Sequence, residues 1–181
     1  MRGAFLRRLL TPRVAREPLA TAPEKHRAVV IGYGPVGQTV STLLQQRGVD
    51  PTVIELNIET VQRLNRDGTR AVYGDAMHPD ILREAGVPAA LGLILSFPAS
   101  PESAQVIQAA REMNPGIRVL VRCKFLSQAD TMRQAGADET FSGEAEVAMA
   151  MIDYILNDLG ATPEQLDSER AQARKELYGR E

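Results

Sequence analysis

Short apolar runs and longer amphipathic stretches alternate along the chain between residues 27 and 158. The runs include "AVVI" and "LGLIL", which are apolar at consecutive positions, as is typical of parallel strands buried on both faces. They predict six strands, the last of them weak, over residues 28–31, 52–55, 70–73, 91–96, 118–122 and 139–141.

The stretches between these runs have helical character, and glycine-containing turns separate the elements. They predict helices over residues 36–46, 58–66, 79–85, 102–113, 126–134 and 144–159, with a further charged helix over residues 162–181. Strands that alternate with helices through right-handed crossovers give an α/β fold, a Rossmann-like doubly wound parallel sheet, here with a C-terminal helical extension. Its ligand site is expected at the carboxyl ends of the strands, near the point where the strand order reverses.

The composition is that of a folded domain. The 181 residues are 44% apolar, which is enough for one domain with a core plus short extensions. The formal net charge of −2 gives no support for a nucleic-acid-binding protein, in which a basic footprint is expected. The single cysteine excludes an internal disulfide and is consistent with a reducing compartment.

Charge divides the chain into parts. Residues 1–27 carry seven Lys or Arg and two Asp or Glu, whereas residues 28–159 carry ten and sixteen. A basic leader over residues 1–26 therefore precedes a domain over 27–159 and a helical tail over 160–181. The leader is interpreted either as a solvated linker or as a juxtamembrane segment at an anionic membrane surface, and an Arg-rich transit peptide is a third interpretation.

The segment "VVIGYGPVGQTV" places Gly32, Gly34 and Gly37 in the order G-x-G-x-x-G between a strand and a helix. In this motif the first glycine permits a tight turn, the second lets a pyrophosphate approach the backbone, and the third lets the helix pack on the strand. Glu55 ends the second strand about 20 residues later, where a carboxylate accepts hydrogen bonds from ribose hydroxyls and repels a 2′-phosphate. The pattern predicts a nucleotide site that disfavours NADP.

Two further strands end in polar residues. The third is followed by "YGDA", which places Asp75 at the rim of the same crevice, as a hydrogen-bond acceptor for adenosine, as a cap of the next helix, or as both. The fifth ends in "LVRCK", where Arg122 is a charge on an otherwise apolar strand. Because a buried guanidinium needs a partner, Arg122 is expected to contact a phosphate, a second ligand or an acidic neighbour.

After the fifth strand about 60 residues remain, and they are predicted to form two or three helices and a weak strand. A hydride-transfer enzyme needs a second part that holds the nicotinamide and the substrate, with a general acid or base in it. No segment is left for such a part. We therefore expect a nucleotide sensor rather than an enzyme. An NAD-dependent oxidoreductase and a soluble nucleotide-binding protein without a membrane partner are the alternatives.

The motifs "VVIGYGPVG", "VYGDA", "ILREAGV", "LVRCKF" and "QAGADET" occur in order, with Glu55 after the first. Together they resemble the RCK/KTN (TrkA-N type) nucleotide-binding domain, the N-terminal part of regulators of K⁺ conductance, over roughly residues 27–159. The cytosolic regulatory domain of Kef-type monovalent cation:proton antiporters is especially similar, because it carries "FP" after the fourth strand and R-x-[RK] after the fifth. The absence of the second subdomain found in channel-associated members favours the antiporter type.

This resemblance implies a regulatory module at the cytoplasmic, inner face of the cell membrane. Such a module binds AMP, ADP, ATP or NAD(H), forms a homodimer and passes its ligand state to the membrane transport domain of a cation antiporter, in the same longer chain or as a separate subunit. By position, the glycine loop and Glu55 would hold phosphate and ribose, and Asp75 with Ala76 would hold the adenosine. No catalytic or metal-binding residue is predicted. The predicted cofactor-binding residues are Gly32, Tyr33, Gly34, Pro35, Val36, Gly37, Glu55, Gly74, Asp75, Ala76, Ser96 and Arg122.

Overall fold

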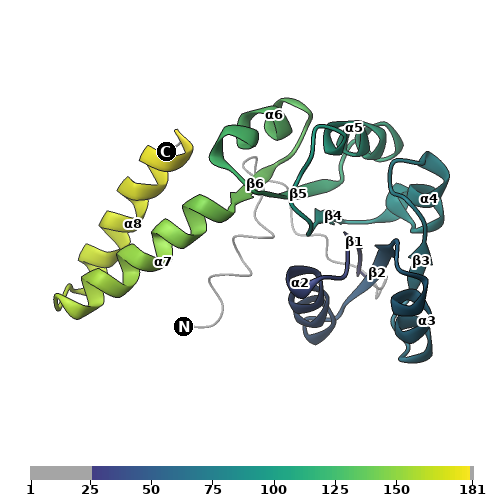
Figure 1. Cartoon of the computed structure of the whole chain (residues 1–181), viewed down its shortest axis with the longest axis horizontal. Coiled ribbons are helices and arrows are strands. Elements are labelled where there is room, and N and C mark those ends of the chain that lie inside the picture. Colours follow the sequence, from purple (N-terminus) through teal and green to yellow (C-terminus); the bar gives the residue numbers. More distant parts are fainter. Residues whose placement is uncertain (1–25, 180–181) are drawn as a thin grey trace, which may run out of the picture.

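Six parallel strands form one sheet in this structure, a computed structural model that describes residues 26–179 (Figure 1). The strand order is β3-β2-β1-β4-β5-β6, so the order reverses between β1 and β4. The α/β doubly wound fold predicted from the sequence is confirmed. The strands are β1 (His26–Ile31), β2 (Val49–Glu55), β3 (Ala71–Tyr73), β4 (Gly92–Leu95), β5 (Arg118–Cys123) and β6 (Glu139–Ser142).

Helices cover both faces of the sheet. Because the crossovers are right-handed and the order reverses once, α2 and α3 lie on one face and α4, α5 and α6 on the other (Figure 1). The helices are α2 (Pro35–Gln46), α3 (Ile58–Arg66), α4 (Pro79–Glu84), α5 (Ser103–Met113), α6 (Ala129–Gln134), α7 (Gly143–Asp158) and α8 (Pro163–Tyr178), with short 3₁₀ turns η1 (Val87–Ala89) and η2 (Leu126–Gln128).

The larger part of the core lies between the sheet and helices α4, α5 and α6, where alternate residues of β5 such as Val119 and Val121 are fully buried. A smaller cluster on the opposite face contains Val30 and Ile94 and is covered by α2. Strands β1 and β4 are therefore buried from both sides. This explains why their sequences are apolar at consecutive positions.

Strand β2 begins at Val49, three residues before the predicted start. The strand therefore includes Pro51, which has no N–H to donate. Strand β1 pairs with β2 along its whole length, whereas β3 pairs only with Val53–Glu55. The first part of β2 thus has a strand on one side only, which is where a proline is tolerated.

Helix α3 has the predicted bounds, the other helices differ from the prediction at one or both ends, and for two of them side-chain hydrogen bonds accompany the difference. Helix α5 begins one residue later than expected, and the hydroxyl of Ser103 accepts a hydrogen bond from the N–H of Ser100 (3.1 Å) in the turn before it. The helix predicted over residues 126–134 is divided into η2 and α6. The side-chain oxygen of Gln128 accepts the N–H of Phe125 (3.1 Å) and holds the start of this segment in a separate turn.

Helices α7 and α8 form a hairpin, called here the arm, that extends away from the sheet after β6 (Figure 1). Asp153 of α7 accepts two hydrogen bonds from the Arg170 guanidinium of α8, at 2.5 and 2.8 Å. Near the end of α8, the hydroxyl of Tyr178 accepts the N–H of Ser142 (3.0 Å) and donates to Oε1 of Glu146 (3.1 Å). Polar contacts at two levels thus join α8 to α7 and to the end of β6.

The predicted leader over residues 1–26 lies outside the described residues except for His26, which begins β1. The division into leader, domain and tail stays a prediction. Within residues 26–179, no helix has both the length and the apolar character that a membrane crossing requires.

Helix α2 approaches the turn after β1 so closely that a side chain cannot lie between them. A Cβ atom on Gly37 would lie 2.2 Å from the carbonyl oxygen of Gly32 and 2.8 Å from Oγ of Ser96. Gly32 has a φ of 88°, in the left-handed region that favours glycine. The backbone therefore requires the first and third glycines of the motif.

We predict that Gly37→Ala lowers the free energy of unfolding by about 1–3 kcal/mol, because the new methyl group meets backbone atoms that cannot move aside. Urea unfolding followed by circular dichroism measures the loss. Gly34→Ala is the matched control, since its φ is −69° and no atom lies within 4 Å of the added Cβ. Equal stability of the two variants would contradict this account of α2 packing.

A second prediction concerns the arm. The hydrogen bonds from Arg170 hold the pKa of Asp153 below its ordinary value. A carboxyl with a lowered pKa in the folded state stabilises that state above its unfolded pKa, and this contribution is lost as the pH falls through the lower, folded value. Asp153→Asn should therefore reduce the urea midpoint of the arm at about pH 7, and reduce it by less at about pH 3, which lies below the ordinary Asp pKa of about 3.9.

The exposed Asp158 of α7 provides the control, because Asp158→Asn removes the same charge without removing the contact with Arg170. Hydrogen exchange of α8 amides, measured at both pH values, reports on the arm alone. An effect of Asp153→Asn that is the same at both pH values would contradict the role assigned to this ion pair.

Candidate functional site

A cavity of about 620 Å³ opens at the carboxyl ends of β1 to β5, where the strand order reverses. Its volume lies within the range of small-molecule sites, about 300–1,000 Å³. The walls come from the β1–α2 loop, the end of β2, the β3–α4 loop, the β4–α5 loop and the end of β5. The strand ends thus bring together segments that are far apart in the sequence.

All of the predicted cofactor-binding residues except Gly37 line this cavity. Gly37 is buried behind the loop, where its role is to let α2 approach. Contact of the other residues with a ligand stays a prediction. The residues that line the cavity as predicted are Gly32, Tyr33, Gly34, Pro35, Val36, Glu55, Gly74, Asp75, Ala76, Ser96 and Arg122.

Sequence reasoning missed most of the β4–α5 wall. The pair Phe97–Pro98 served only to recognise the family, and Glu102 was taken as part of a helix. The strand order of a Rossmann-like sheet could have predicted this wall. In that order β4 lies beside β1, so the loop after β4 must lie beside the glycine loop after β1. The additional lining residues are Ile31, Leu56, Met77, Phe97, Pro98, Ser100, Glu102, Ser103 and Val106.

The carboxylate of Glu55 is held by three backbone N–H groups. Oε2 accepts the N–H of Tyr33 (2.8 Å), and Oε1 accepts those of Leu56 (2.7 Å) and Asn57 (3.0 Å). A carboxylate has about four acceptor positions, so the geometry leaves room for a further donor such as a ribose hydroxyl. Glu55 therefore ties the glycine loop to the end of β2 and still presents a negative charge to the cavity.

The glycine loop presents free backbone donors. The N–H of Tyr33 donates to Glu55, and Pro35 has no N–H. The N–H groups of Gly34, Val36 and Gly37 have no acceptor within residues 26–179. These groups surround the N-terminus of α2, where the helix dipole adds a positive field. A phosphate is the kind of group that such an arrangement binds. The space beside Gly34 is open, since no atom lies within 4 Å of a Cβ built there.

Ser96 has a positioning role. Its side chain is buried, and its hydroxyl lies 2.9 Å from the carbonyl oxygens of both Ile31 and Gly32. The single hydroxyl proton is therefore directed to the backbone of the glycine loop and not into the cavity. Ser96 fixes the end of β4 against the end of β1.

Asp75 lies at the exposed rim formed by the β3–α4 loop. Its Oδ1 accepts the N–H of Met77 (2.9 Å), which stabilises the turn, and Oδ2 has no hydrogen-bond partner in the described part of the chain. The residue that precedes α4 is His78, so Asp75 does not cap that helix. The cap predicted for Asp75 is therefore wrong, because its carboxylate stabilises the turn before the helix instead, and the adenosine contact stays a prediction.

Arg122 is the single basic side chain among the described residues that line the cavity, and it is half-buried. One of its terminal nitrogens lies 3.4 Å from the carbonyl oxygen of Ser96, and no carboxylate of residues 26–179 forms an ion pair with it. A guanidinium has five donors, so most of them have no protein acceptor here. Of the three possibilities for Arg122, an acidic neighbour is not observed in the described residues.

Three carboxylates share the cavity with this arginine: Glu55, Asp75 and Glu102. A hydrogen bond from Ser100 lowers the pKa of Glu102, so Glu102 is ionised at neutral pH. The negative groups therefore outnumber the positive one. No three His, Cys, Asp or Glu side chains within residues 26–179 are grouped as metal ligands.

Hydrogen bonds connect the cavity wall to the arm. The N–H of Ala99 donates to the carbonyl oxygen of Arg122 (2.8 Å), and the side chain of Gln128 donates to the carbonyl oxygen of Ala99 (3.1 Å). Two residues before Gln128, the N–H of Leu126 donates to Oε2 of Glu144 in the first turn of α7 (2.8 Å). The β4–α5 loop and the first turn of α7 are thus joined through η2.

Comparison with known proteins identifies the domain. The TrkA-N domain model matches residues 28–143. The putative cation/proton antiporter YbaL of Escherichia coli (strain K12) is 30% identical over 130 residues, which cover 72% of this chain and 23% of the antiporter. The crystal structure of the TrkA-N domain of YbaL superposes with a TM-score of 0.69 at 29% identity and covers 74% of this chain and 98% of that domain.

More distant structures share the fold. The Kef C-terminal domain of Shewanella denitrificans in its AMP-bound form has a TM-score of 0.70 at 19% identity, over 85% of this chain and 96% of that domain. The GsuK channel bound to NAD has a TM-score of 0.60 at 19% identity, over 82% of this chain and 26% of the channel. The chain spans less than a quarter of the antiporter that it matches in sequence. From the extent of the family match and the identity to YbaL, the chain belongs to the TrkA-N domain family.

Proposed function

We propose that this domain senses an adenine nucleotide and regulates a transporter of K⁺ or another monovalent cation, of the Kef antiporter type. The observation that carries the proposal is one cavity in which the guanidinium of Arg122 and N–H groups of the glycine loop, neither of them paired with an acid of residues 26–179, accompany the carboxylate of Glu55. Donors for a phosphate and an acceptor for a ribose are the two requirements of a nucleotide site.

The charges of the cavity limit the choice of nucleotide. The carboxylate of Glu55 would repel a 2′-phosphate, which favours NAD(H) over NADP(H). One arginine faces three carboxylates, so AMP, ADP and NAD(H) are expected to bind more tightly than ATP with its higher charge. The AMP-bound Kef C-terminal domain and the NAD-bound GsuK channel, which share the fold, support this order.

The role is regulatory in this proposal and not catalytic. The domain acts as a homodimer at the inner face of the membrane, joined to a transport domain in the same chain or in another subunit. Ligand binding at the β4–α5 loop would change the hydrogen bonds through Gln128 and Leu126 and so reach α7. The nucleotide must bind the two states of the dimer with different affinity for this to regulate transport.

Titration calorimetry with AMP, ADP, ATP, NAD⁺, NADH and NADP⁺ tests the proposal. We expect micromolar binding of at least one of the first five nucleotides. Arg122→Gln should weaken it about 10–100-fold, because charge-assisted hydrogen bonds to phosphate contribute about 1.5–3 kcal/mol. Arg66→Gln is the matched control, since Arg66 is exposed on α3 and lies outside the cavity lining. No binding, or equal binding by Arg122→Gln, would overturn the assignment.

Glu55→Ala should leave the domain folded but weaken NAD⁺ binding about tenfold, because the ribose loses its acceptor and the N–H of Tyr33 loses the group that holds it. The affinity for NADP⁺ should fall less, since the variant also removes the repulsion between Glu55 and the 2′-phosphate. The Kd for NADP⁺ divided by the Kd for NAD⁺ should therefore decrease. Glu59→Ala removes an exposed carboxylate of α3 and serves as the control. An unchanged ratio would contradict the placement of the ribose beside Glu55.

A further inference from the structure

The side chain of Gln128, in η2, makes three hydrogen bonds with the main chain. Its Oε1 accepts the N–H of Lys124 (2.9 Å) and the N–H of Phe125 (3.1 Å), and its Nε2 donates to the carbonyl oxygen of Ala99 (3.1 Å). An amide side chain has two donors and two acceptor positions, so three of the four are used. Gln128 is not among the residues that line the nucleotide cavity. Its amide therefore acts on the protein backbone and not directly on a ligand.

One of the three hydrogen bonds of Gln128 is not needed for the local turn. The N–H groups that Oε1 accepts lie three and four residues earlier, as when a side chain holds the start of its own helical turn. Nε2, in contrast, donates to a residue 29 positions earlier. A side chain that served only to start η2 would need Oε1 alone. The contact with Ala99 therefore joins η2 to a different part of the fold.

Ala99 belongs to the β4–α5 loop, between Pro98 and Ser100, which both line the cavity. Ala99 is buried, and both of its backbone groups are bonded. Its N–H donates to the carbonyl oxygen of Arg122 (2.8 Å), and its own carbonyl oxygen accepts the bond from Gln128. The loop is therefore bound to the residue that carries the guanidinium through one group and to Gln128 through the other.

These two bonds take the place of a neighbouring strand. The pairing of β4 with β5 ends at Leu95 and Val121, one residue before Arg122, whereas β6 still pairs with Arg122 itself. On its β4 side, the backbone at Arg122 is therefore held by Ala99, and Ala99 is held by Gln128. Backbone groups beyond the end of a ladder need such partners when they are buried.

The side chain of Arg122 contributes little to fixing its own position. One terminal nitrogen lies 3.4 Å from the carbonyl oxygen of Ser96, longer than the usual distance of about 2.9–3.0 Å. No carboxylate of residues 26–179 forms an ion pair with it. The place of the guanidinium therefore depends on the backbone at the end of β5, and through Ala99 on Gln128.

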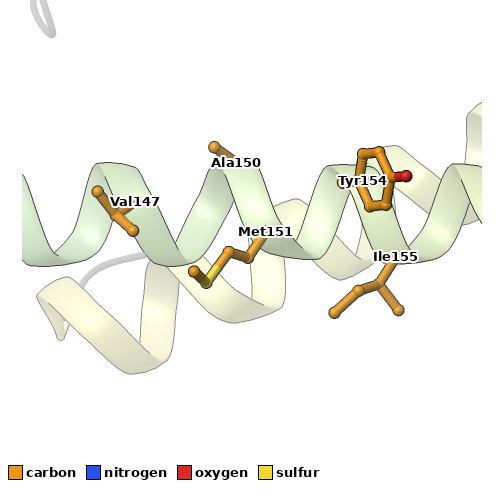
Figure 2. A pocket seen from close by; sticks show the side chains of 5 residues that line it. All are labelled: Val147, Ala150, Met151, Tyr154 and Ile155. Atoms are coloured by element: carbon orange, nitrogen blue, oxygen red, sulfur yellow. The ribbon is translucent and has the colours of Figure 1, made fainter.

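The turn η2 also contacts the arm, where the N–H of Leu126 donates to Oε2 of Glu144 (2.8 Å). Farther along α7, exposed side chains border a hollow of about 350 Å³ whose surface is apolar. This surface carries no charge that could hold a phosphate, so an effect of η2 on the nucleotide is expected at Arg122. The side chains around the hollow, drawn in Figure 2, are Val147, Ala150, Met151, Tyr154 and Ile155.

We propose that Gln128 is a positioning residue of the nucleotide site: its contact with Ala99 sets the place of Arg122 beside the β4–α5 loop and thereby the affinity for a phosphate group. This rests on the proposed function and adds to it a residue outside the cavity. Hydrogen bonds from a guanidinium to a phosphate depend steeply on distance and angle, so a small displacement of Arg122 weakens them. An effect that reaches the ligand only through Arg122 disappears when Arg122 is replaced.

Titration calorimetry of the full chain with AMP tests this role. Gln128→Met keeps the length of the side chain but removes its donors and its acceptor. We expect the Kd for AMP to rise about 3–10-fold, less than for Arg122→Gln, because the arginine remains but is less well placed. Gln134→Met is the matched control, since Gln134 is exposed at the end of α6 and lies outside the cavity lining. An unchanged Kd in Gln128→Met would overturn the proposal.

Adenosine, which has no phosphate, separates positioning from a general loss of structure. Its Kd should be the same for Gln128→Met and the unaltered chain, although AMP binds more weakly. Equal weakening of both ligands would reveal a general disturbance of the cavity and would refute the positioning role. Circular dichroism checks the fold, which should persist because Lys124 and Phe125 are exposed and water can replace the lost acceptor.

A double-mutant cycle tests the route through Arg122. When Gln128→Met is added to Arg122→Gln, the Kd for AMP should stay close to that of Arg122→Gln alone, because two residues that act through one contact are not additive. The control pair, Gln134→Met with Arg122→Gln, should give the same value. If the effects of Gln128→Met and Arg122→Gln multiply instead, Gln128 acts independently of the guanidinium and the proposal is wrong.

Gln128→Glu identifies the contact that matters. A carboxylate still accepts the N–H groups of Lys124 and Phe125 but cannot donate to the carbonyl oxygen of Ala99. We expect this variant to weaken AMP binding at least as much as Gln128→Met does. Ser127→Glu adds the same charge at the exposed neighbouring position and should bind AMP as the unaltered chain does. Normal AMP binding by Gln128→Glu would contradict the role given to Ala99.

The same titrations distinguish this proposal from the proposed function. If the unaltered chain binds ADP or NAD⁺ more tightly than AMP, the variants are titrated with that nucleotide. Micromolar binding that is equal in the unaltered chain and in Gln128→Met would overturn the positioning role and leave the sensor in place. No binding of any of these nucleotides by the unaltered chain would overturn both.

Discussion

The rest of this structure depends on the approach of one backbone to another at Gly37. A Cβ atom there would lie 2.2 Å from the carbonyl oxygen of Gly32, so only glycine lets α2 begin directly beside the end of β1. That position places the N-terminus of α2 at the wall of the cavity. Ser96 then fixes the same turn to β4, and Glu55 fixes it to β2. The loop is held from both sides before any ligand is present, which reduces the entropy lost on binding.

The selectivity proposed for this cavity is electrostatic. The positive field comes from the N-terminus of α2, from N–H groups that no described residue accepts and from the guanidinium of Arg122, which border one cavity. The negative groups, Glu55 and Asp75, lie at the ends of the neighbouring strands β2 and β3, where a ribose and a base would extend. A ligand with one negative end and several hydroxyl or amino donors matches this division, whereas added phosphates meet Glu102.

The arm is joined to the cavity wall by hydrogen bonds. The first turn of α7 accepts the N–H of Leu126, and Gln128 of the same η2 turn donates to the carbonyl oxygen of Ala99 in the β4–α5 loop. A change at the β4–α5 loop that moves η2 would therefore move α7. A rigid helix transmits such a displacement along its length, and Asp153, Glu146 and Tyr178 keep α8 attached to it.

The sequence by itself determined the order of strands and helices, the Rossmann-like class and most of the glycine loop, because apolar periodicity and backbone conformation are local properties. It also placed Glu55, since the end of a strand is visible in the pattern. Only the tertiary structure decided that residues 97–103 form a wall of the cavity, that the hydroxyl of Ser96 is directed to backbone and that Arg122 lacks a carboxylate partner in the described chain. It also decided which apolar side of α7 stays exposed. These features depend on contacts between segments distant in sequence, and local periodicity carries no information about which segments meet.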